Sequence, residues 1–561
     1  MTETTNETYD IVVCGAGVAG LSAAIFGALR GLSVVVLEKT AVVGGTSALS
    51  AGTVWVPNNH LGKTVNPDDT VENAHRYLKA VVGDKLNEEK AGAFLSLGPR
   101  AIRELVEKTD VQFRPRPHHP DYQSLLPGAT SCGRALEPVP FDAKALGDDM
   151  SLVRKPLETL TVWGMMADAN DIKNLLSAFR SPRAFAASMR LFSAYGRDLL
   201  RYRRTTRLLM GNALVARLLL SARKMGVKLH METTIREIVQ TNGAVSGVVA
   251  NEGDNTVRFN ARLGVVLATG GFTHSKSLRE RVLPKPVSAI SATPDSVTGD
   301  GINAGLAAGG TLKEDYPDGA FWAPVSLRPL PDGRRQIYPH FFLDRGKPGF
   351  IAVDRSGQRF VNEATSYDAF VTAMYARQPA VEAVPCHLIA DARAVKKYGI
   401  GLVRPGGMGL RKLLAENYLQ SAPDLRTLAG RIGVDPDGLE RTVTRFNAFA
   451  KAGCDEDFHR GETTANKVLG DPAHLPNTCL GPLETAPYYA LEIQPGLNGT
   501  SSGLNTDNAG RVLDSSGTPI DGLYACGNDM ASLMEGEYPG PGTTLGPAIT
   551  FAYAAVQAMT A

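Results

Sequence analysis

A glycine-rich segment and one acidic residue give the first chemical signal in this sequence. Gly15-Ala16-Gly17-Val18-Ala19-Gly20 separates a short apolar run from a stretch with helical spacing, and Glu38 follows about 20 residues later. Glycines at this spacing let backbone N–H groups approach a pyrophosphate at a helix N-terminus, while the carboxylate accepts hydrogen bonds from ribose hydroxyls. The pattern predicts a dinucleotide site formed by Gly15, Ala16, Gly17, Ala19, Gly20, Glu38 and Lys39.

Further small and hydroxyl-bearing residues indicate which dinucleotide binds. Gly44-Gly45-Thr46-Ser47 and Ser50-Ala51-Gly52 form a second cluster that NAD dehydrogenases do not usually carry. Two later segments, 268–271 and 521–528, resemble motifs of glutathione reductase and fumarate reductase-like flavoproteins. We therefore expect FAD, with additional contacts from Gly45, Thr46, Ser47, Ala51, Gly52, Ile235, Ala268, Thr269, Gly270, Asp300, Gly527, Asn528, Thr544 and Leu545.

The residues after the Gly-Gly pair bear on how FAD is held. Flavoproteins of the succinate dehydrogenase branch often have a histidine there that bonds covalently to FAD, whereas this chain has Thr46, Ser47 and Ala48. We expect non-covalent FAD. The ten histidines show no pairing at metal-ligand spacing, so no metal site is expected.

Three segments that contain tyrosine resemble 3-ketosteroid Δ1-dehydrogenases, and the resemblance spans nearly the whole chain. The first is Pro120-Asp121-Tyr122, followed by Gly133-Arg134-Ala135-Leu136-Glu137-Pro138. The second is Gly357-Gln358-Arg359-Phe360-Val361-Asn362-Glu363, followed by Tyr367. The third and most specific is Tyr538-Pro539-Gly540-Pro541-Gly542-Thr543-Thr544-Leu545-Gly546-Pro547.

This resemblance implies a reaction and assigns its residues. A 3-keto-4-ene steroid would lose a proton from C2 and a hydride from C1 to flavin N5, giving a 3-keto-1,4-diene in steroid or sterol degradation. The resemblance makes Tyr367 the base, Tyr122 its hydrogen-bonding helper, and Tyr538 with the N–H of Gly542 the stabilisers of the enolate. Because tyrosine has an ordinary pKa of about 10, either that pKa must fall or the enolate contacts must acidify the proton.

Other functions remain open at this stage. One is dehydrogenation of a saturated ketosteroid at C4 and C5, and another is a fumarate reductase-like activity, because the segment 357–363 recurs in that branch. A fumarate reductase-like enzyme would need cationic groups to bind the two carboxylates of its substrate, and the segment 538–545 offers none. A catalytically silent flavin or sterol-binding protein is a third possibility. The C17 side chain of the steroid, the natural electron acceptor and the oligomeric state are left undetermined.

The elements that position these residues follow from the apolar patterns. Residues 9–14, 21–30 and 33–37 read as a β-α-β unit, and 238–249 as a hairpin that turns at Asn242-Gly243. Residues 425–451 read as helical, and 547–559 as a closing helix. We expect an α/β protein with a Rossmann-like FAD-binding domain, residues 1–297 and 486–561. An inserted α+β catalytic domain would occupy 298–485.

Composition limits the partners. The 561 residues carry a net charge of only +2, which does not favour a nucleic-acid partner. The six cysteines lack Cys-x-x-Cys spacing, and the polar N-terminus lacks a signal-peptide pattern, so we expect a cytoplasmic protein. Arginines and lysines concentrate in 173–224, a range that overlaps the basic helical insertion expected at about 150–210. Such a segment can be a solvated face or can contact an anionic membrane, and peripheral membrane association is a hypothesis.

Overall fold

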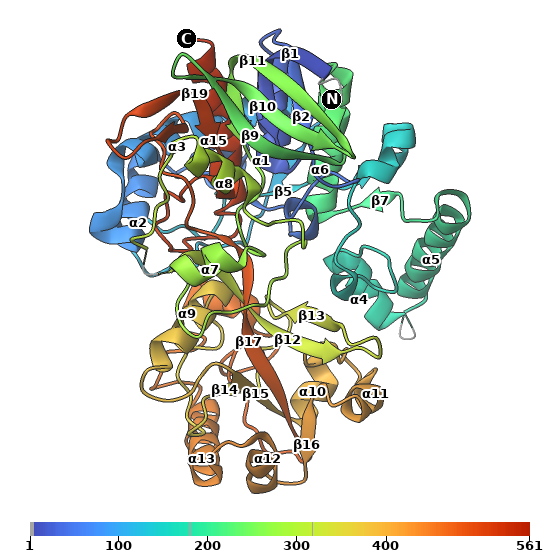
Figure 1. The fold of residues 1–561 in the computed structure, drawn as a ribbon. Coiled ribbons are helices and arrows are strands. Elements are labelled where there is room, and N and C mark those ends of the chain that lie inside the picture. The colour runs from blue at the N-terminus through green and yellow to red at the C-terminus, as the bar shows by residue number, and fades with distance from the viewer. Residues whose placement is uncertain (1–4, 179–180, 317) are drawn as a thin grey trace.

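The computed structural model describes residues 5–178, 181–316 and 318–561. Its first sheet runs in the order β18-β19-β11-β1-β2-β8, and β10 and β9 continue from β11 as a hairpin (Figure 1). The strands are β1 (Thr5–Cys14), β2 (Val34–Leu37), β8 (Lys228–His230), β9 (Thr233–Thr241), β10 (Ala244–Glu252), β11 (Asn255–Leu267), β18 (Arg511–Leu513) and β19 (Pro519–Ala525). The parallel pairs β1·β2 and β1·β11 form its centre, which confirms the expected Rossmann-like unit.

Two helices cover the central strands. Helix α1 (Val18–Ala28) follows the glycine-rich loop directly, and α15 (Leu545–Met559) closes the chain beside it. The rings of Phe26 and Tyr553 meet edge to face at 4.9 Å between these helices. Ile11, Val12 and Val13 of β1 have no exposed surface, as expected for a central strand with helices packed against it. The predicted closing helix is therefore confirmed. It begins at Leu545, seven residues after Tyr538.

The predicted hairpin is also present. Strands β9 and β10 pair in antiparallel register, and the turn residues Asn242 and Gly243 have φ values of 54° and 85°. Two positive φ values in succession are typical of the tight hairpin turns that Asn-Gly favours.

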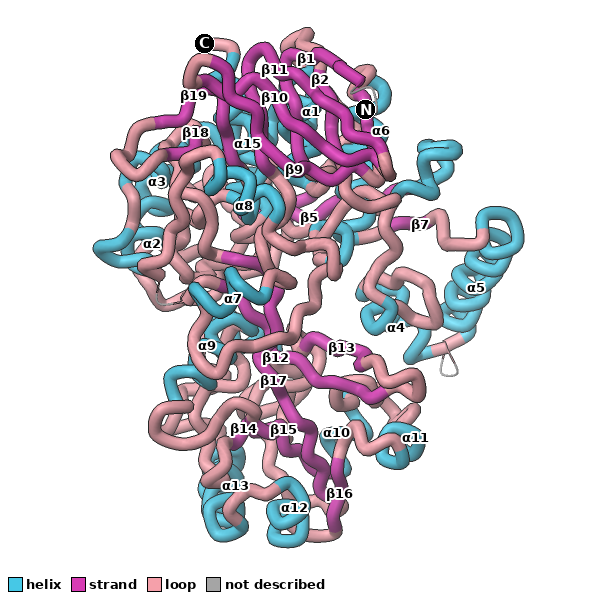
Figure 2. Tube along the Cα trace, in the orientation of Figure 1, coloured by secondary structure: helices cyan, strands magenta, loops and turns pink. Residues whose placement is uncertain are grey.

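The second sheet lies on the other side of the molecule (Figure 2). Its order is β13-β12-β17-β15-β14, with β16 also paired to β17. The strands are β12 (Ala320–Pro329), β13 (Arg335–Pro339), β14 (Phe350–Val353), β15 (Cys386–Asp391), β16 (Gln420–Ala422) and β17 (Tyr488–Thr500). Because β17 is the centre of this sheet, the second domain continues past the expected boundary at 485, and the chain returns to the first sheet only after Thr500.

Helices surround the second sheet. They are α9 (Tyr367–Arg377), α10 (Ala392–Tyr398), α11 (Leu410–Ala415), α12 (Leu425–Ile432), α13 (Pro436–Ala452) and α14 (Thr464–Leu469). The stretch 425–451 was expected to be helical throughout, but it divides into α12 and α13. Gly433, with φ 68°, ends α12, and the Asp435 side chain caps the start of α13.

Smaller elements complete the first domain. Strands β3 (Val54–Trp55), β5 (Ala135–Pro138) and β4 (Phe113–Pro115) form one small sheet, and β6 (Phe141–Asp142) pairs with β7 (Arg207–Leu208). The helices are α2 (Val71–Val82), α3 (Glu88–Lys108), α4 (Ala169–Ser177), α5 (Pro182–Tyr202), α6 (Met210–Lys224), α7 (Lys276–Val282) and α8 (Asp300–Ala307). Helices α4 and α5 lie in the segment where an insertion is expected, and they project beside the two sheets (Figure 1). Arg180, in that basic segment, lies outside the described residues.

Candidate active site

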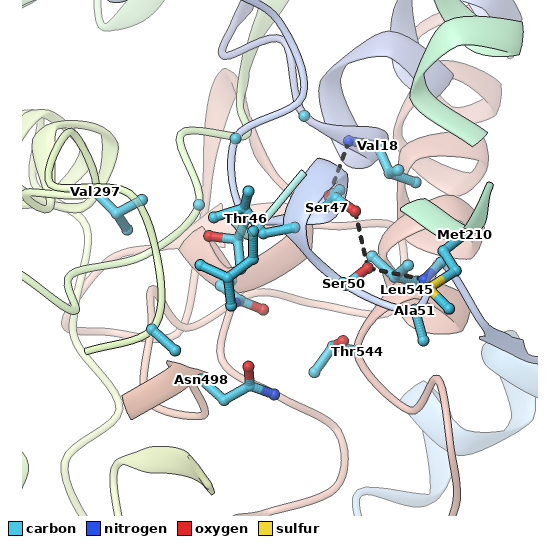
Figure 3. A pocket seen from close by; sticks show the side chains of 18 of the residues that line it. Val18, Thr46, Ser47, Ser50, Ala51, Met210, Val297, Asn498, Thr544 and Leu545 are labelled. Carbon is cyan, nitrogen blue, oxygen red and sulfur yellow. Dashed lines mark hydrogen bonds between the residues drawn. The ribbon is translucent and has the colours of Figure 1, made fainter. Parts of the chain in front are cut away.

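One long cavity joins the two domains and collects nearly all the predicted site residues. It is lined by every predicted cofactor residue except Gly20, and by Tyr122, Tyr367, Tyr538 and Gly542. Figure 3 shows the part near the start of α1, where Thr46, Ser47, Asn498 and Thr544 surround the open space. Residues far apart in the sequence therefore form one site.

The start of α1 has the geometry of a dinucleotide loop. The carboxylate of Glu38 accepts a hydrogen bond from the Ala16 N–H at 3.0 Å and is largely buried. Gly15 has φ 108°, and a Cβ there would lie 2.3 Å from the carbonyl oxygen of Ala268. Gly20 has a packing role instead of lining the cavity, because a Cβ there would lie 1.8 Å from the Gly15 oxygen. Only glycine allows β1, α1 and β11 to meet this closely.

The neighbouring loops are fixed by hydrogen bonds. The Val18 N–H donates to the Ser47 hydroxyl at 3.3 Å. Asp529 accepts from the N–H groups of Thr269 at 2.5 Å and Gly271 at 2.9 Å, although burial raises the pKa of this carboxyl to about 6. A Cβ added at Gly45 would meet no atom within 4 Å, so the backbone is open to the cavity there.

These residues fit FAD. Open glycine backbone at the N-terminus of α1 suits a pyrophosphate, and Glu38 suits ribose hydroxyls. Lys39 does not remain free for a ligand, because its amine pairs with Asp300 at 2.8 Å and donates to the Thr298 hydroxyl at 2.6 Å. Lys39 and Asp300 therefore line the cavity as a pair that joins β2 to the start of α8.

At the other end of the cavity, three tyrosines from distant segments meet. Tyr367 is the first residue of α9, and its hydroxyl donates to the Tyr538 hydroxyl at 2.8 Å. The Tyr122 ring stacks on Tyr538 at 6.0 Å and meets Tyr367 edge to face at 6.0 Å. Phe341 packs on Tyr367 at 4.9 Å, while Phe321 packs on Tyr538 at 5.3 Å. The tyrosines thus form one aromatic cluster.

The expected hydrogen bond between Tyr122 and Tyr367 is not part of this structure. The buried Tyr122 hydroxyl has no partner among the described residues, and Tyr367 is bonded to Tyr538 instead. The two side chains are nevertheless in contact, because their rings meet edge to face at 6.0 Å and the Tyr367 side chain lowers the pKa of the Tyr122 hydroxyl against the effect of burial.

The Tyr538 segment is held rigidly. The Pro539 carbonyl accepts from the Tyr77 hydroxyl at 2.6 Å and from the Tyr122 N–H at 2.9 Å. Gly542 has φ 94°, and a Cβ there would lie 2.4 Å from the Thr53 carbonyl oxygen. The backbone must therefore approach β3 closely at this point, which explains the glycine.

Tyr122 is positioned by a buried ion pair. Arg134 donates to Asp121 at 2.8 Å and to Asp69 at 2.7 Å, and all three side chains are almost fully buried. Asp121 also accepts from the indole N–H of Trp55 at 2.8 Å. Arg134 lies in the segment 133–138 and Asp121 precedes Tyr122, so two separate motifs of the sequence form one support.

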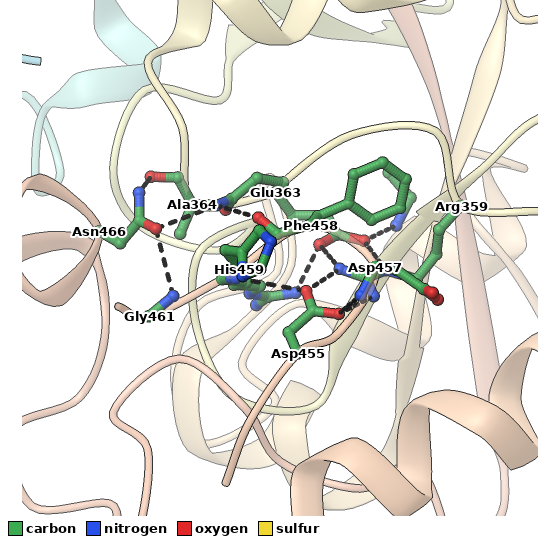
Figure 4. A network of polar contacts seen from close by, with 12 residues as sticks. Arg359, Glu363, Ala364, Asp455, Asp457, Phe458, His459, Gly461 and Asn466 are labelled. Atoms are coloured by element: carbon green, nitrogen blue, oxygen red, sulfur yellow. Dashed lines mark hydrogen bonds and ion pairs between the residues drawn. The ribbon is translucent and has the colours of Figure 1, made fainter. Parts of the chain in front are cut away.

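A second buried network supports Tyr367 (Figure 4). Glu363 binds Arg359 at 2.8 Å and Arg460 at 2.9 Å, and Arg359 also binds Asp455 at 2.8 Å. Burial opposes ionisation of Glu363, but the two guanidinium groups hold the pKa of this carboxyl below its usual value. The segment 357–363 is therefore a structural anchor for the residues just before α9.

Burial also shifts the tyrosines. It is the largest influence on Tyr122, Tyr367 and Tyr538, and it raises the pKa of each hydroxyl well above its usual value. A base made from these groups must therefore be helped by a nearby positive charge or by a substrate that is easily deprotonated.

Sequence reasoning missed several residues of the cavity. Asn498 of β17 lies near Thr544 (Figure 3), and its segment 496–503 is rich in glycine and serine, the signal used for 44–52. The insertion contributes Leu157, Val162 and Ile172. Phe341 also lines the cavity, whereas Leu125 is 81% exposed and is not among the lining residues.

Comparisons with known proteins agree with this geometry. The family model described as FAD binding domain matches residues 10–545. A 4-oxocyclohex-2-ene-1-carboxylate 5-dehydrogenase of Sinomonas cyclohexanicum is 39% identical, covering 97% of this chain and 92% of the relative. A 3-oxosteroid 1-dehydrogenase of Mycobacterium tuberculosis is 37% identical and covers 98% of both chains.

A solved structure is similar over the full length. The 3-ketosteroid delta1-dehydrogenase of Sterolibacterium denitrificans, in complex with 1,4-androstadiene-3,17-dione, has a TM-score of 0.91 and 36% identity to this chain. The match covers 99% of each chain, so it includes both sheets and the insertion.

Proposed function

The chain belongs to the FAD-binding family that includes 3-oxosteroid 1-dehydrogenases, and we propose that it catalyses the FAD-dependent 1,2-dehydrogenation of 3-ketosteroids. The observation that carries the proposal is the hydrogen bond between Tyr367 and Tyr538 at the end of the FAD cavity. When a ketone enolises, the neighbouring carbon loses a proton and the ketone oxygen gains negative charge. Two phenols in contact can serve these two positions, one as the base and one as the hydrogen-bond donor.

Each residue has a role in this reaction. Tyr538 and the N–H of Gly542 stabilise the negative charge that develops on the ketone oxygen, since both are fixed by the rigid segment 538–544. Tyr367 removes the proton from C2, and Tyr122 supports it through the aromatic cluster. FAD, when bound, supplies the acceptor for the hydride from C1. The aromatic rings give this end of the cavity an apolar wall.

The substrate is assigned as a steroid on two grounds. Several relatives and the structure with a TM-score of 0.91 carry 3-ketosteroid names, and their similarity extends over the whole chain. The C4–C5 dehydrogenase and fumarate reductase-like alternatives have less support. A cyclic ketone acid is a second candidate, because the 39% identical relative acts on 4-oxocyclohex-2-ene-1-carboxylate. Both substrates contain a ring ketone next to the carbon pair that is oxidised.

Product analysis separates these substrates. The purified holoenzyme is incubated with an artificial electron acceptor and either androst-4-ene-3,17-dione or 4-oxocyclohex-2-ene-1-carboxylate. We expect the steroid to give its 1,4-diene with the higher kcat/KM. A higher kcat/KM for the ring acid would replace the steroid assignment, and turnover of neither would overturn the reaction class.

We further propose that the insertion contacts an anionic membrane. Helix α5 exposes Arg183, Arg190, Arg197 and Arg201 together with Phe185, Met189, Leu199 and Leu200. Basic and large apolar side chains on one exposed helix favour binding at a charged lipid surface. The insertion also lines the cavity, so a membrane-dissolved sterol would meet the protein near the site. Within the described residues, no helix has the length and hydropathy that crossing a bilayer requires.

A flotation assay tests the contact. Leu200 is 90% exposed on α5, and Leu475, which is 76% exposed in the second domain, provides a matched control. We expect Leu200→Glu to reduce binding to vesicles that contain anionic lipid, and Leu475→Glu to leave it unchanged. Equal binding by all three proteins, or no binding at low salt, would exclude the contact.

A further inference from the structure

A buried arginine lies beside the tyrosines and is not among the residues to which the proposed reaction gives a role. Arg345 is 2% exposed, and its guanidinium donates only to backbone carbonyl groups. These are the oxygens of His340 at 3.0 Å, Phe341 at 3.3 Å, Glu363 at 2.7 Å and Thr365 at 2.6 Å.

Arg345 differs from its buried neighbours in charge balance. Arg359 and Arg460 are paired with Glu363 and Asp455, whereas no carboxylate of the described residues lies within ion-pair distance of the Arg345 guanidinium. The nearest candidate, Asp344, directs its carboxylate to His340 at 2.7 Å and to the Gly401 N–H at 2.9 Å. Burying an ion without a paired counter-charge is unfavourable, so a compensating interaction or a function is expected.

Arg345 contacts residues that lie next to Tyr367 in the sequence or pack on its ring. Thr365 lies two residues before it, and Phe370, on the next part of α9, lies 5.5 Å from the guanidinium carbon. Phe341 accepts a hydrogen bond from Arg345 and packs its ring on Tyr367 at 4.9 Å. The arginine therefore holds the N-terminus of α9 and places a positive charge beside the aromatic cluster.

We propose that Arg345 is a positioning residue for the base, and that its charge, which no carboxylate contacts directly, stabilises the phenolate form of the neighbouring tyrosines Tyr122 and Tyr367. This inference rests on the proposed function. A cation inside a dry site acts strongly on a nearby phenol, because no water screens it. The charge opposes the effect of burial, which alone would keep both tyrosines protonated.

The electrostatic contributions agree in sign. Burial raises the pKa of Tyr122 most and Tyr538 adds to that rise, while Tyr367, Arg345 and Arg116, in that order, oppose it. The groups that face Tyr367 are Tyr122 and Tyr538, and Asp368 acts on Tyr538. Around Arg345 itself, Asp344 is the nearby negative charge and Arg460 the nearby positive charge.

Three variants test the effect of the charge at and beside Arg345. Arg345→Gln removes the cation, Arg345→Lys keeps it, and Asp344→Asn removes the nearby negative charge. Arg328→Gln is a matched control, because Arg328 of β12 pairs with Glu416 and is not part of the tyrosine cluster. The readout is the rate of anaerobic flavin reduction by androst-4-ene-3,17-dione as a function of pH, in variants that retain FAD.

The expected shifts in the midpoint of the pH–rate profile follow from the phenolate being the base. A phenolate base makes the rate rise with pH, so a higher pKa moves the rise to higher pH. We expect Arg345→Gln to shift the midpoint upward by about one to three pH units, with a rate about 10-fold or more lower below it and recovery above it. Arg345→Lys and Arg328→Gln should keep the wild-type midpoint, and Asp344→Asn should lower it.

Other results would overturn the assignment. A slower Arg345→Gln enzyme with an unchanged midpoint would show a purely structural role. If that variant fails to fold, an Asp344→Asn midpoint that does not fall, or a shifted Arg345→Lys midpoint, would contradict it. A wild-type enzyme that the steroid does not reduce at any pH would instead overturn the proposed function, and this assignment with it.

Discussion

At the residue scale, the 2.8 Å hydrogen bond links the protonation of Tyr367 and Tyr538. Tyr367 donates in this bond, so when Tyr367 is a phenolate, Tyr538 can donate back to it or to a ketone oxygen, but its single proton cannot serve both. Rearrangement of this bond is therefore part of substrate binding. The hydroxyl of Tyr122, which has no partner among the described residues, is the neighbouring donor that can replace Tyr538.

Replacement of Tyr538 tests the enolate contact. Tyr538→Phe keeps the ring that packs on Phe321 but loses the donor, so we expect flavin reduction by a 3-ketosteroid to slow by about 10²–10³-fold with FAD retained. Tyr375→Phe is the control, because Tyr375 lies on α9 but bonds to the Pro286 carbonyl away from the cluster. Stopped-flow absorbance measures both, and an unchanged rate in Tyr538→Phe would rule out this role.

The site residues were predictable only in part. Glu38 and the glycines of 15–20 follow from spacing alone, since their chemistry is local to one β-α-β unit. The meeting of Tyr122, Tyr367 and Tyr538 does not follow from spacing, because they come from segments hundreds of residues apart, and it was expected only from a family resemblance. Arg345 could not be identified from the sequence. What distinguishes it is that its guanidinium donates to backbone carbonyl groups and not to a carboxylate, which only the folded structure shows.

At the level of the elements, the loop before α1 and the end of β11 are in close contact, and we expect FAD binding to depend on this contact. Gly15 permits this contact with φ 108°, a conformation that other residues rarely adopt. The loop in turn places the N-terminus of α1 toward the cavity.

Gly15→Ala should therefore yield a colourless protein. The added Cβ would lie 2.3 Å from the Ala268 oxygen, so β1 and β11 must separate and the pyrophosphate loop must move. Gly92→Ala on α3 is the control, because its Cβ would meet no atom within 4 Å. The measured quantity is bound FAD per protein after gel filtration. A yellow Gly15→Ala protein with full FAD content would show that this contact is dispensable.

Elements with simple patterns were predicted better than β17. The Asn242-Gly243 hairpin was found because its turn residues have one favoured geometry. Strand β17 carries Pro495 and two glycines, which normally argue against a central strand, and it pairs opposite Pro324 with a register shift nearby. Its role in the second sheet, and thus the domain boundary, could not be read from local sequence.

At the scale of the whole molecule, the chemistry depends on two domains meeting at one cavity. The first domain supplies the dinucleotide loop, Tyr122 and Tyr538, while the second supplies Tyr367 from α9. The chain crosses between the sheets before β12 and after β17, and the cavity is lined by residues that precede each crossing, Val297 and Asp300 before the first and Asn498 before the second. A change in the angle between the domains would separate the base from the enolate contact and the flavin site.

The most direct test of the central claim is a single anaerobic turnover. The holoenzyme is mixed with androst-4-ene-3,17-dione, either unlabelled or deuterated at C1, while flavin absorbance is followed and the product is identified. We expect bleaching of the flavin with one equivalent of 1,4-diene formed, and slower bleaching with the deuterated steroid. Absence of bleaching, or bleaching without the diene, would contradict it.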